Sequence, residues 1–249
     1  MIRDVEIRNR ARRLGVDIDL IRKDHVLNHL LAAIAEIPND VVFRGGTALA
    51  RIYWPDFRIS EDLDFLVEGK LAQATELVEQ AVGVAAERTG LDLTVEFDHP
   101  DSDMVRALVG WGEMRLAIDL NRAERPALAI DRRDLDLPYS DLSLSICGIR
   151  VVALEEILAN KWYMLDDRKE PRDLFDLWYG VCVRSVPLDP VADAFRAKYL
   201  AKPGLWRVER ARKLEAAWEE RLAHQVNDLP PFKEVFGAVH ARVQAWEEG

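Results

Sequence analysis

The chain has 249 residues, of which 49% are hydrophobic, and it carries a formal net charge of −10 at pH 7. This length and composition suit one large domain or two modest domains with a real core, and they exclude a disordered tail or a mini-protein. The acidic charge argues against a general nucleic-acid coat protein, because binding to phosphates is driven largely by Lys and Arg.

The expected location follows from the distribution of apolar residues. No stretch approaches the roughly 18 consecutive apolar residues of a membrane span, and residues 1–15 lack the apolar region of a secretory signal. We therefore expect a cytoplasmic protein with no membrane segment. Cys147 and Cys182 each lie in an apolar run, which favours reduced packing thiols over a disulfide framework or a zinc site.

The first part of the chain alternates helical and strand patterns. Apolar residues recur at helical spacing from about residue 19 to 37, and Pro38 closes that pattern. A short strand over 41–43 leads into a glycine pair, after which Thr47 is placed to cap a helix through about residue 53. The next predicted elements are a strand over 62–68, a helix over 70–90, and strands over 91–97, 104–111 and 113–121.

The character of the sequence changes near residue 150. The segment over 131–145, "DRRDLDLPYSDLSLS", is predicted to be a loop with little regular structure. Helical patterns dominate from Ala153 onward, so we expect an α/β domain over residues 1–150 and a helical domain over residues 151–249. The predicted helices run over about 153–166, 171–182, 189–200, 205–224 and 231–246.

Two carboxylates stand out in the strand over 62–68, because residues two apart in a strand project to one face. Asp62 and Asp64 therefore point together, while Leu63 and Phe65 point to the other side. Two ionised carboxylates that close repel each other unless a cation lies between them, and a divalent metal is the usual solution. A solvated strand edge without a metal is an equally simple interpretation of this pair.

Asp119 is the third candidate carboxylate. In the strand over 113–121, alternation puts Arg115, Ala117 and Asp119 on one face. If this strand lies beside the Asp62/Asp64 strand, three carboxylates converge, and such a set can hold two Mg²⁺ ions for phosphoryl or nucleotidyl transfer. The alternative is a strand-end residue that bonds to the following turn.

The glycine pair Gly45-Gly46 lies between a predicted strand and a predicted helix, about fifteen residues before the Asp pair. Glycines in this place let backbone N–H groups approach an anion closely at the positive end of a helix, which suits a triphosphate. The pair is a weak signal by itself, because the chain shows neither the Gly-Lys-Ser/Thr of a Walker A loop nor a Rossmann pattern here.

Lys161 lies on the apolar stripe of its predicted helix, three and four residues after Leu158 and Ile157. A lysine in this position needs a partner, and the sequence leaves two possibilities. Its amine reaches past the apolar surface to water, or it contacts a bound phosphate. Asp173, in the first turn of the next helix, is favoured there by the helix dipole whatever its function.

His25 and His29 lie four residues apart on the predicted helix over 19–37, a spacing that metal-binding histidines use. No Glu joins them in a His-Glu-x-x-His arrangement, so the sequence favours a polar flank of the helix over a zinc site. The sequence also contains no Gly-x-Ser-x-Gly nucleophile motif.

The chain resembles a known family in two separate regions. The first region is "FRGGTALARIY" followed by "RISEDLDF", and the second is "LEEILANKWYMLDDRKEPRDLFDLW". Both are similar to signatures of the AbiEii/AbiGii-type nucleotidyltransferase toxins, a group that includes the mycobacterial MenT toxins. The matches span roughly residues 22–180, and Arg44 stands where Lys is common in relatives.

This resemblance implies an α+β fold of the DNA polymerase β nucleotidyltransferase type, in which a small mixed sheet flanked by helices precedes a helical C-terminal half. It implies that Asp62 and Asp64 bind Mg²⁺, and the superfamily's use of a third carboxylate adds Asp119 to them. Lys161 and Asp173 complete the catalytic residues from the helical domain. The implied nucleotide-binding residues are Gly45, Gly46, Thr47, Arg58, Ser60 and Lys161.

The resemblance also implies a function. Its members are toxins of bacterial toxin–antitoxin pairs of the abortive-infection type, which act in phage defence. They transfer NMP from an NTP to an acceptor hydroxyl and release pyrophosphate. In relatives the acceptor is the 3′ end of tRNA, whose modification blocks translation, and a cognate antitoxin is then the expected partner.

Two alternatives to tRNA modification stay open. One is nucleotidyl transfer to a protein hydroxyl or to a small molecule such as an aminoglycoside, which the acidic charge favours. The other is a non-catalytic nucleotide-binding module that has kept the fold.

Overall fold

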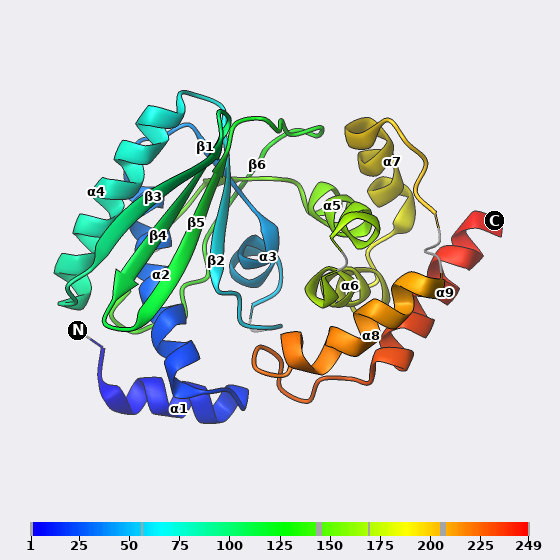
Figure 1. Ribbon diagram of the computed structural model, residues 1–249, viewed down its shortest axis with the longest axis horizontal. Helices are drawn as coiled ribbons and strands as arrows, with labels where there is room; N and C mark the ends of the chain where they lie inside the picture. Colours follow the sequence, from blue (N-terminus) through cyan, green and yellow to red (C-terminus); the bar gives the residue numbers. More distant parts are fainter. Residues whose placement is uncertain (1, 56, 143–145, 169, 205–207, 249) are drawn as a thin grey trace. The chain divides into compact units, whose positions relative to one another are not determined.

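The computed structural model describes residues 2–55, 57–142, 146–168, 170–204 and 208–248. The chain divides into two compact units: the first is Met1–Arg125 with Ile130–Val152, and the second is Pro126–Ala129 with Ala153–Gly249. Within the described residues, all strands belong to the first unit and the second unit is helical (Figure 1). None of the helices in this described part combines the length and the apolarity that a membrane span needs.

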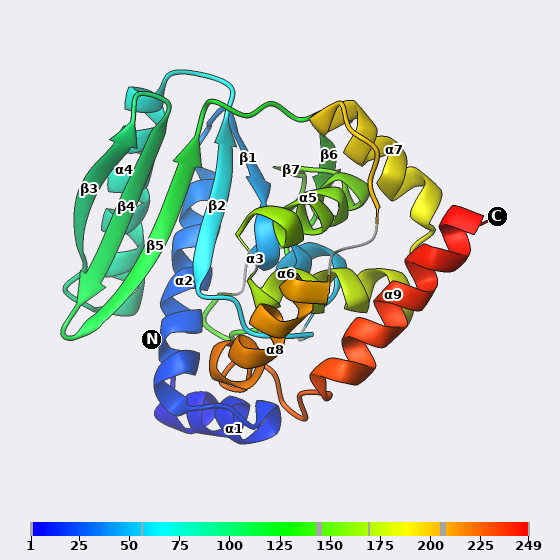
Figure 2. The same ribbon diagram turned by 45° about the vertical axis from the view of Figure 1, so that its right-hand side comes forward.

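A mixed β-sheet organises the first unit. Within the described residues it has seven strands: β1 (Val41–Arg44), β2 (Asp62–Val67), β3 (Thr94–Asp101), β4 (Met104–Trp111), β5 (Met114–Asn121), β6 (Asp131–Arg133) and β7 (Ile149–Val151). Their order across the sheet is β3-β4-β5-β2-β1-β7-β6 (Figure 2). β2 is parallel to β5 and β1 is parallel to β7, whereas the other neighbours are antiparallel.

Two long helices of the first unit, α2 (Ile18–Glu36) and α4 (Leu71–Thr89), pack on each other and against the sheet (Figures 1 and 2). α4 buries a stripe at helical spacing that includes Leu77, Val78 and Ala81. α1 (Asp4–Leu14) packs on α2. A short helix, α3 (Gly45–Ala48), follows β1 and continues into a π-helical turn, η1 (Leu49–Tyr53).

Polar residues of α2 are buried along with its apolar ones. His25 and His29 are only 6% and 1% exposed, so the polar flank predicted for this pair is wrong. Burial, and after it the charge of His25, lowers the pKa of His29 to about 4. Asp24, one residue before His25, accepts hydrogen bonds from the side chains of Arg51 and Tyr139.

The sequence patterns do not predict two elements of the first unit, α1 and β6. The charged sequence of residues 4–14 does not predict α1, because its buried positions are only Ile7, Arg10 and Ala11. The loop predicted over 131–145 contains β6, which pairs with β7. Strands of three residues are too short to show an alternating pattern. Residues 143–145 of that predicted loop lie outside the described residues.

The structure also corrects the predictions for two single residues, Thr47 and Cys147. Thr47 does not cap the helix, because α3 begins at Gly45 and the Thr47 hydroxyl donates to the backbone carbonyl of Asp62. Cys147 is exposed instead of packed in the core, whereas Cys182 is partly buried.

The second unit consists of α5 (Leu154–Asp167), α6 (Pro171–Trp178) with a π-helical turn η2 (Tyr179–Val183), α7 (Leu188–Tyr199), α8 (Val208–Leu222) and α9 (Phe232–Glu248). α5 packs on α6 and α7, and α6 packs on α8 and α9 (Figure 2). Trp162 anchors this core, with its ring 6.1 Å from that of Phe195 and 5.8 Å from that of Trp246. The predicted helix start at residue 205 lies outside the described residues.

Glu156 ties residues 126–129 to the helices of the second unit. One of its carboxylate oxygens accepts hydrogen bonds from the backbone N–H groups of Ala127 and Leu128 at 2.9 and 3.0 Å. The other lies 2.9 Å from Nζ of Lys198 on α7. These contacts of the buried Glu156 carboxylate therefore explain why residues 126–129 fold with the helices of the second unit.

Candidate functional site

The predicted carboxylates Asp62, Asp64 and Asp119 converge on two neighbouring strands of the first unit. Alternation along β2 leaves Asp62 and Asp64 partly exposed and buries Leu63 and Phe65. β5 lies beside β2, with Asp119 directly opposite Asp64 in the register. β2 and β5 are therefore neighbours, as predicted from the sequence. This pairing places the three carboxylates on the partly exposed face of the sheet.

Arg106 on β4 is a member of this group that the sequence argument missed. Its Nε and Nη2 atoms donate to the two carboxylate oxygens of Asp119 at 2.7 and 2.8 Å. These hydrogen bonds raise the pKa of Arg106 above its ordinary value, and the charges of Asp62 and Asp64 add to the effect. Alternation in "MVRALVGW" puts Arg106 on the exposed face, but only the pairing of β4 with β5 brings it to Asp119.

The glycine turn lies against this carboxylate group. Gly45 has a φ of +79°, and a Cβ atom added to it would be 2.2 Å from Oδ2 of Asp64. A Cβ on Gly46 would be 2.2 Å from Nη2 of Arg58 and 3.3 Å from Oγ of Ser60. Gly45 requires glycine, because its positive φ strains any larger residue and a Cβ would displace the Asp64 carboxylate, whereas a Cβ at Gly46 would push aside the end of the Arg58 side chain.

The remaining predicted residues of the first unit support the turn from below the surface. Thr47, Arg58 and Ser60 are buried. The Thr47 hydroxyl donates to the backbone of Asp62, and the Arg58 guanidinium donates to the carbonyl of Ile59 at 3.1 Å. The first unit thus brings together Gly45, Gly46, Thr47, Arg58, Ser60, Asp62, Asp64 and Asp119.

Lys161 in the second unit is buried and paired. Its Nζ atom lies 3.0 Å from Oδ1 of Asp173 and 2.9 Å from Oδ2 of Asp176. Arg168 also donates to both carboxylate oxygens of Asp173 at 2.8 Å. The possibility that the amine of Lys161 reaches water is therefore wrong for this structure, since two buried carboxylates surround it.

Asp173 remains ionised in spite of its burial. Burial by itself raises the pKa of this carboxyl, but the charge of Lys161 and the hydrogen bonds from Arg168 outweigh it and lower the pKa below its ordinary value. Sequence reasoning missed Asp176 and Arg168. The signal for Asp176 was its position three residues after Asp173, which puts both carboxylates on one face of α6.

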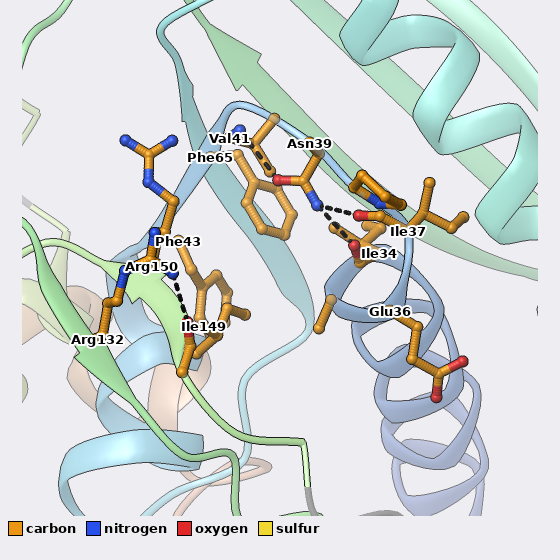
Figure 3. Close-up of a pocket in the computed structure, with 13 residues that line it drawn as sticks. Ile34, Glu36, Ile37, Asn39, Val41, Phe43, Phe65, Arg132, Ile149 and Arg150 are labelled. Carbon is orange, nitrogen blue, oxygen red and sulfur yellow. Dashed lines mark hydrogen bonds between the residues drawn. The ribbon is translucent and has the colours of Figure 1, made fainter.

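A separate pocket of about 190 Å³ lies between the end of α2 and the strands β1 and β7 of the first unit (Figure 3). The Asn39 side chain forms part of its wall by donating to the carbonyls of Ile34 and Ile37 at 2.8 and 2.7 Å. Its one carboxylate among the described residues, Glu36, lies 2.6 Å from Arg88. This pocket therefore lacks the converging oxygen ligands of the Asp62/Asp64/Asp119 group.

Comparisons with known proteins identify a family and a similar fold. A family model described as nucleotidyl transferase AbiEii toxin, type IV toxin–antitoxin system, matches residues 25–242. MenT4, a nucleotidyltransferase toxin from Mycobacterium tuberculosis H37Rv, has a similar structure, with a TM-score of 0.67 and 20% sequence identity. The match covers 98% of this chain and 89% of MenT4, and it confirms the predicted nucleotidyltransferase fold.

Two structures of the antibiotic-resistance factor ANT(2″)-Ia align less well with this chain. The first, a solution structure, has a TM-score of 0.37 at 14% identity and covers 91% of this chain and 96% of its own. The second, in complex with adenylyl-2″-tobramycin, has a TM-score of 0.34 at 16% identity and covers 80% of this chain and 98% of its own. A search of curated proteins finds no match.

Proposed function

The chain belongs to the AbiEii family of nucleotidyltransferase toxins of type IV toxin–antitoxin systems, and from this premise we propose that it is Mg²⁺-dependent and transfers NMP from an NTP to the 3′ end of tRNA, which blocks translation. Membership of the family implies an NTP substrate and an antitoxin partner. One observation carries the proposal: Asp62, Asp64 and Asp119 lie on adjacent strands beside a turn whose first glycine, Gly45, has a positive φ and adjoins the Asp64 carboxylate.

The donor set of the first unit fits Mg²⁺. This ion prefers oxygen ligands and is usually bound through one or two carboxylates plus substrate phosphates. Asp62 and Asp64 supply such carboxylates, and the absence of a side chain at Gly45 leaves room for Asp64 Oδ2. When bound, Mg²⁺ supplies charge neutralisation for the triphosphate and for the attacking and leaving oxygens.

The residues of the chain have distinct roles in this proposal. Asp62 and Asp64 hold the metal, and Asp119 either joins them or accepts the proton of the acceptor hydroxyl. The backbone N–H groups at Gly45 and Gly46, at the start of the helical run, bind the triphosphate. Thr47, Arg58 and Ser60 keep the turn and the start of β2 in place, as their contacts with Asp62 and Gly46 suggest.

For the second unit, we propose that the Lys161 group holds Arg168 as a phosphate-binding cation. Lys161 is paired with Asp173 and Asp176 in the interior of the unit. Arg168 is 47% exposed on its side chain and is bonded to Asp173, so its guanidinium is held near the surface by this pair. Lys161 and Asp173 thus position a cation that can contact phosphate.

Radiolabelled nucleotides test this function directly. The protein is incubated with MgCl₂, total tRNA and each α-labelled NTP in turn, and we expect label on RNA with at least one NTP. Asp64→Asn should lower labelling by more than about 100-fold, whereas Asp92→Asn, a change at an exposed Asp of the same unit, should not. Periodate oxidation of the tRNA 3′ cis-diol should abolish labelling.

Other outcomes of the same experiment distinguish the alternatives. Label that migrates with protein or with a small molecule identifies a different acceptor. Calorimetric binding of Mg²⁺-NTP without any product indicates a non-catalytic module. Equal labelling by the wild type and Asp64→Asn contradicts the proposed site.

A further inference from the structure

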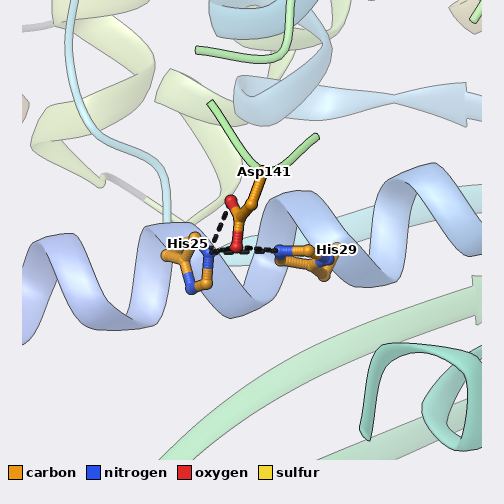
Figure 4. A group of neighbouring side chains, drawn as sticks. All are labelled: His25, His29 and Asp141. Atoms are coloured by element: carbon orange, nitrogen blue, oxygen red, sulfur yellow. Dashed lines mark hydrogen bonds and ion pairs between the residues drawn. The ribbon is translucent and has the colours of Figure 1, made fainter. Parts of the chain in front are cut away.

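A second group of possible metal ligands lies in the first unit, on α2 and in the segment between β6 and β7 (Figure 4). Nε2 of His25 lies 3.2 Å from each carboxylate oxygen of Asp141. Nε2 of His29 lies 3.4 Å from Oδ2 of Asp141 and 3.1 Å from Nε2 of His25. Three side chains therefore direct one ligand atom each toward a common point.

Contacts on α2 and on the segment around Asp141 hold these three side chains in place. Residues four apart on a helix share a face, which aligns His25 and His29 on α2, and their rings meet edge to face with centroids 4.6 Å apart. Tyr139, two residues before Asp141, packs on His25 with ring centroids 5.0 Å apart. The Tyr139 hydroxyl donates to Asp24 at 2.6 Å, so Asp141 approaches α2 on an anchored segment.

The distances between the ligand atoms are close to those of a tetrahedral site. Zn²⁺ binds imidazole nitrogen and carboxylate oxygen at about 2.0–2.2 Å, so neighbouring ligand atoms in a tetrahedron are about 3.3–3.5 Å apart. The two Nε2 atoms are 3.1 Å apart, and they lie 3.2 Å (His25) and 3.4 Å (His29) from the nearest Asp141 oxygens, so two of the three separations are slightly shorter than around a bound ion. The three atoms thus form one face of a tetrahedron, and a water molecule can supply the fourth ligand.

The contacts of His29 favour a ligand role as well. This side chain is 1% exposed, so its polar atoms need partners inside the protein. The polar contacts that the structure gives it are at Nε2, toward His25 and Asp141. Its Nε2 atom faces Asp141, so this nitrogen is available to a cation whose charge the Asp141 carboxylate would balance.

We propose that His25, His29 and Asp141 bind one Zn²⁺ ion, which fastens the segment around Asp141 to α2. Two imidazoles and one carboxylate in a tetrahedral arrangement suit Zn²⁺ among the common biological metals. Mg²⁺ instead prefers octahedral oxygen ligands, so this site and the Asp62/Asp64/Asp119 group select different ions. The proposal does not depend on nucleotidyl transfer.

Metal titration of the full chain tests the site. An Asp62→Asn/Asp64→Asn protein, free of any affinity tag and stripped with a chelator, is titrated with ZnCl₂ against a chromophoric chelator, and bound zinc is counted by elemental mass spectrometry. We expect one Zn²⁺ per chain and, with CoCl₂, the visible absorption of four-coordinate Co²⁺. Zinc should also raise the Tm.

Single substitutions then identify the ligands. His29→Gln and Asp141→Asn should each weaken zinc binding by more than about 100-fold, since even groups that only orient a ligand change affinity by about 10 to 100-fold. His99→Gln, a change at an exposed histidine of the same unit, should bind zinc normally. If His29→Gln does not fold, Asp141→Asn serves alone, because it keeps the size of the side chain.

Two outcomes overturn the proposal. One is the absence of stoichiometric zinc binding to the folded double Asp variant. The other is equal affinity of that protein and its Asp141→Asn derivative, which identifies the group as a hydrogen-bonded His/Asp cluster. Neither outcome bears on nucleotidyl transfer, because no NTP or acceptor is present.

Discussion

Arg106 on β4 and Asp119 on β5 form a bidentate ion pair. The guanidinium atoms Nε and Nη2 lie 2.7 and 2.8 Å from the two carboxylate oxygens. The charges of Asp62 and Asp64 also act on this guanidinium. A carboxylate that we propose as a metal ligand thus already has a cation beside it. Arg106 and Mg²⁺ therefore compete for the same negative charge.

Replacing Arg106 should strengthen Mg²⁺ binding in the absence of nucleotide. Because the Arg106 side chain is 49% exposed, Arg106→Gln should change the free energy of unfolding by less than about 1 kcal/mol. The Mg²⁺ concentration for half-saturation, measured by calorimetry at constant ionic strength, should fall several-fold. Arg122→Gln, which breaks an exposed pair with Asp103, is the control. Weaker Mg²⁺ binding by Arg106→Gln contradicts the competition.

Gly45→Ala should damage both stability and activity. Its positive φ is strained for alanine, and the new Cβ would displace the Asp64 carboxylate, 2.2 Å away. We expect a loss of about 1–3 kcal/mol in the free energy of unfolding and more than about 100-fold in transfer rate.

The matched control for Gly45→Ala is Gly83→Ala on α4. A Cβ at Gly83 meets no atom within 4 Å, so this change should stabilise the protein by about 0.5–1 kcal/mol through its helix propensity. Urea unfolding and labelling assays measure both variants. A fully active Gly45→Ala protein rules out the close contact between the turn and Asp64 as a requirement for catalysis.

Lys161→Met should destabilise the second unit strongly. The change leaves Asp173 and Asp176 buried without their shared amine, and breaking a buried ion pair on one side costs about 3–5 kcal/mol. Denaturant unfolding followed by circular dichroism measures the loss. Arg196→Gln, which breaks an exposed pair with Asp193, should cost less than about 1 kcal/mol.

A Lys161→Met protein that keeps wild-type stability contradicts the pairing. The measured stability of Lys161→Met also decides how a loss of labelling by this variant is interpreted. If Lys161→Met is unstable, its loss of labelling reports on folding, and Arg168→Gln becomes the better probe of phosphate contact, because that side chain is 47% exposed.

Stability in acid should depend on Asp173. Its pKa is lower in the folded chain than the roughly 3.9 of an unfolded Asp. The folded state therefore binds fewer protons, and stability rises with pH in this range. The contribution of Asp173 is present above about pH 4 and is lost as the pH falls through the lower folded pKa.

Urea unfolding of the wild type and Asp173→Asn between about pH 7 and about pH 3 measures this contribution. The wild type should be more stable at neutral pH, and the difference should narrow below about pH 4. Asp193→Asn, at an exposed position, should follow the wild-type curve. Parallel curves for the wild type and Asp173→Asn contradict the lowered pKa.

The longer elements of the chain were predictable from local patterns. Alternation along "DLDFLV" and "MRLAIDL" separates Leu63 and Phe65 from Asp62 and Asp64, and the structure keeps that separation. The periods of strands and helices are geometric, so they appear in the sequence wherever one face is buried. Short elements such as β6 and the charged helix α1 have too few buried positions to show a period.

The partners of the polar residues were not predictable in the same way. Lys161 on an apolar stripe signals a need for a partner, but it does not reveal Asp176. Asp119 was expected to join Asp64, but Arg106 was not expected to occupy both of its oxygens. From the sequence alone, a guanidinium on the exposed face of a strand is expected to be solvated. Its partner is evident only when the neighbouring strand is known.

Sequence alone determined which residues face which side of each element, because that depends on neighbours a few positions away. It therefore identified the carboxylates, the glycine turn and Lys161. Tertiary structure decided which faces meet: Asp64 opposite Asp119 across β2 and β5, and His25 with Asp141 across 116 positions of the chain. Such contacts come from packing the whole unit, so no local period records them.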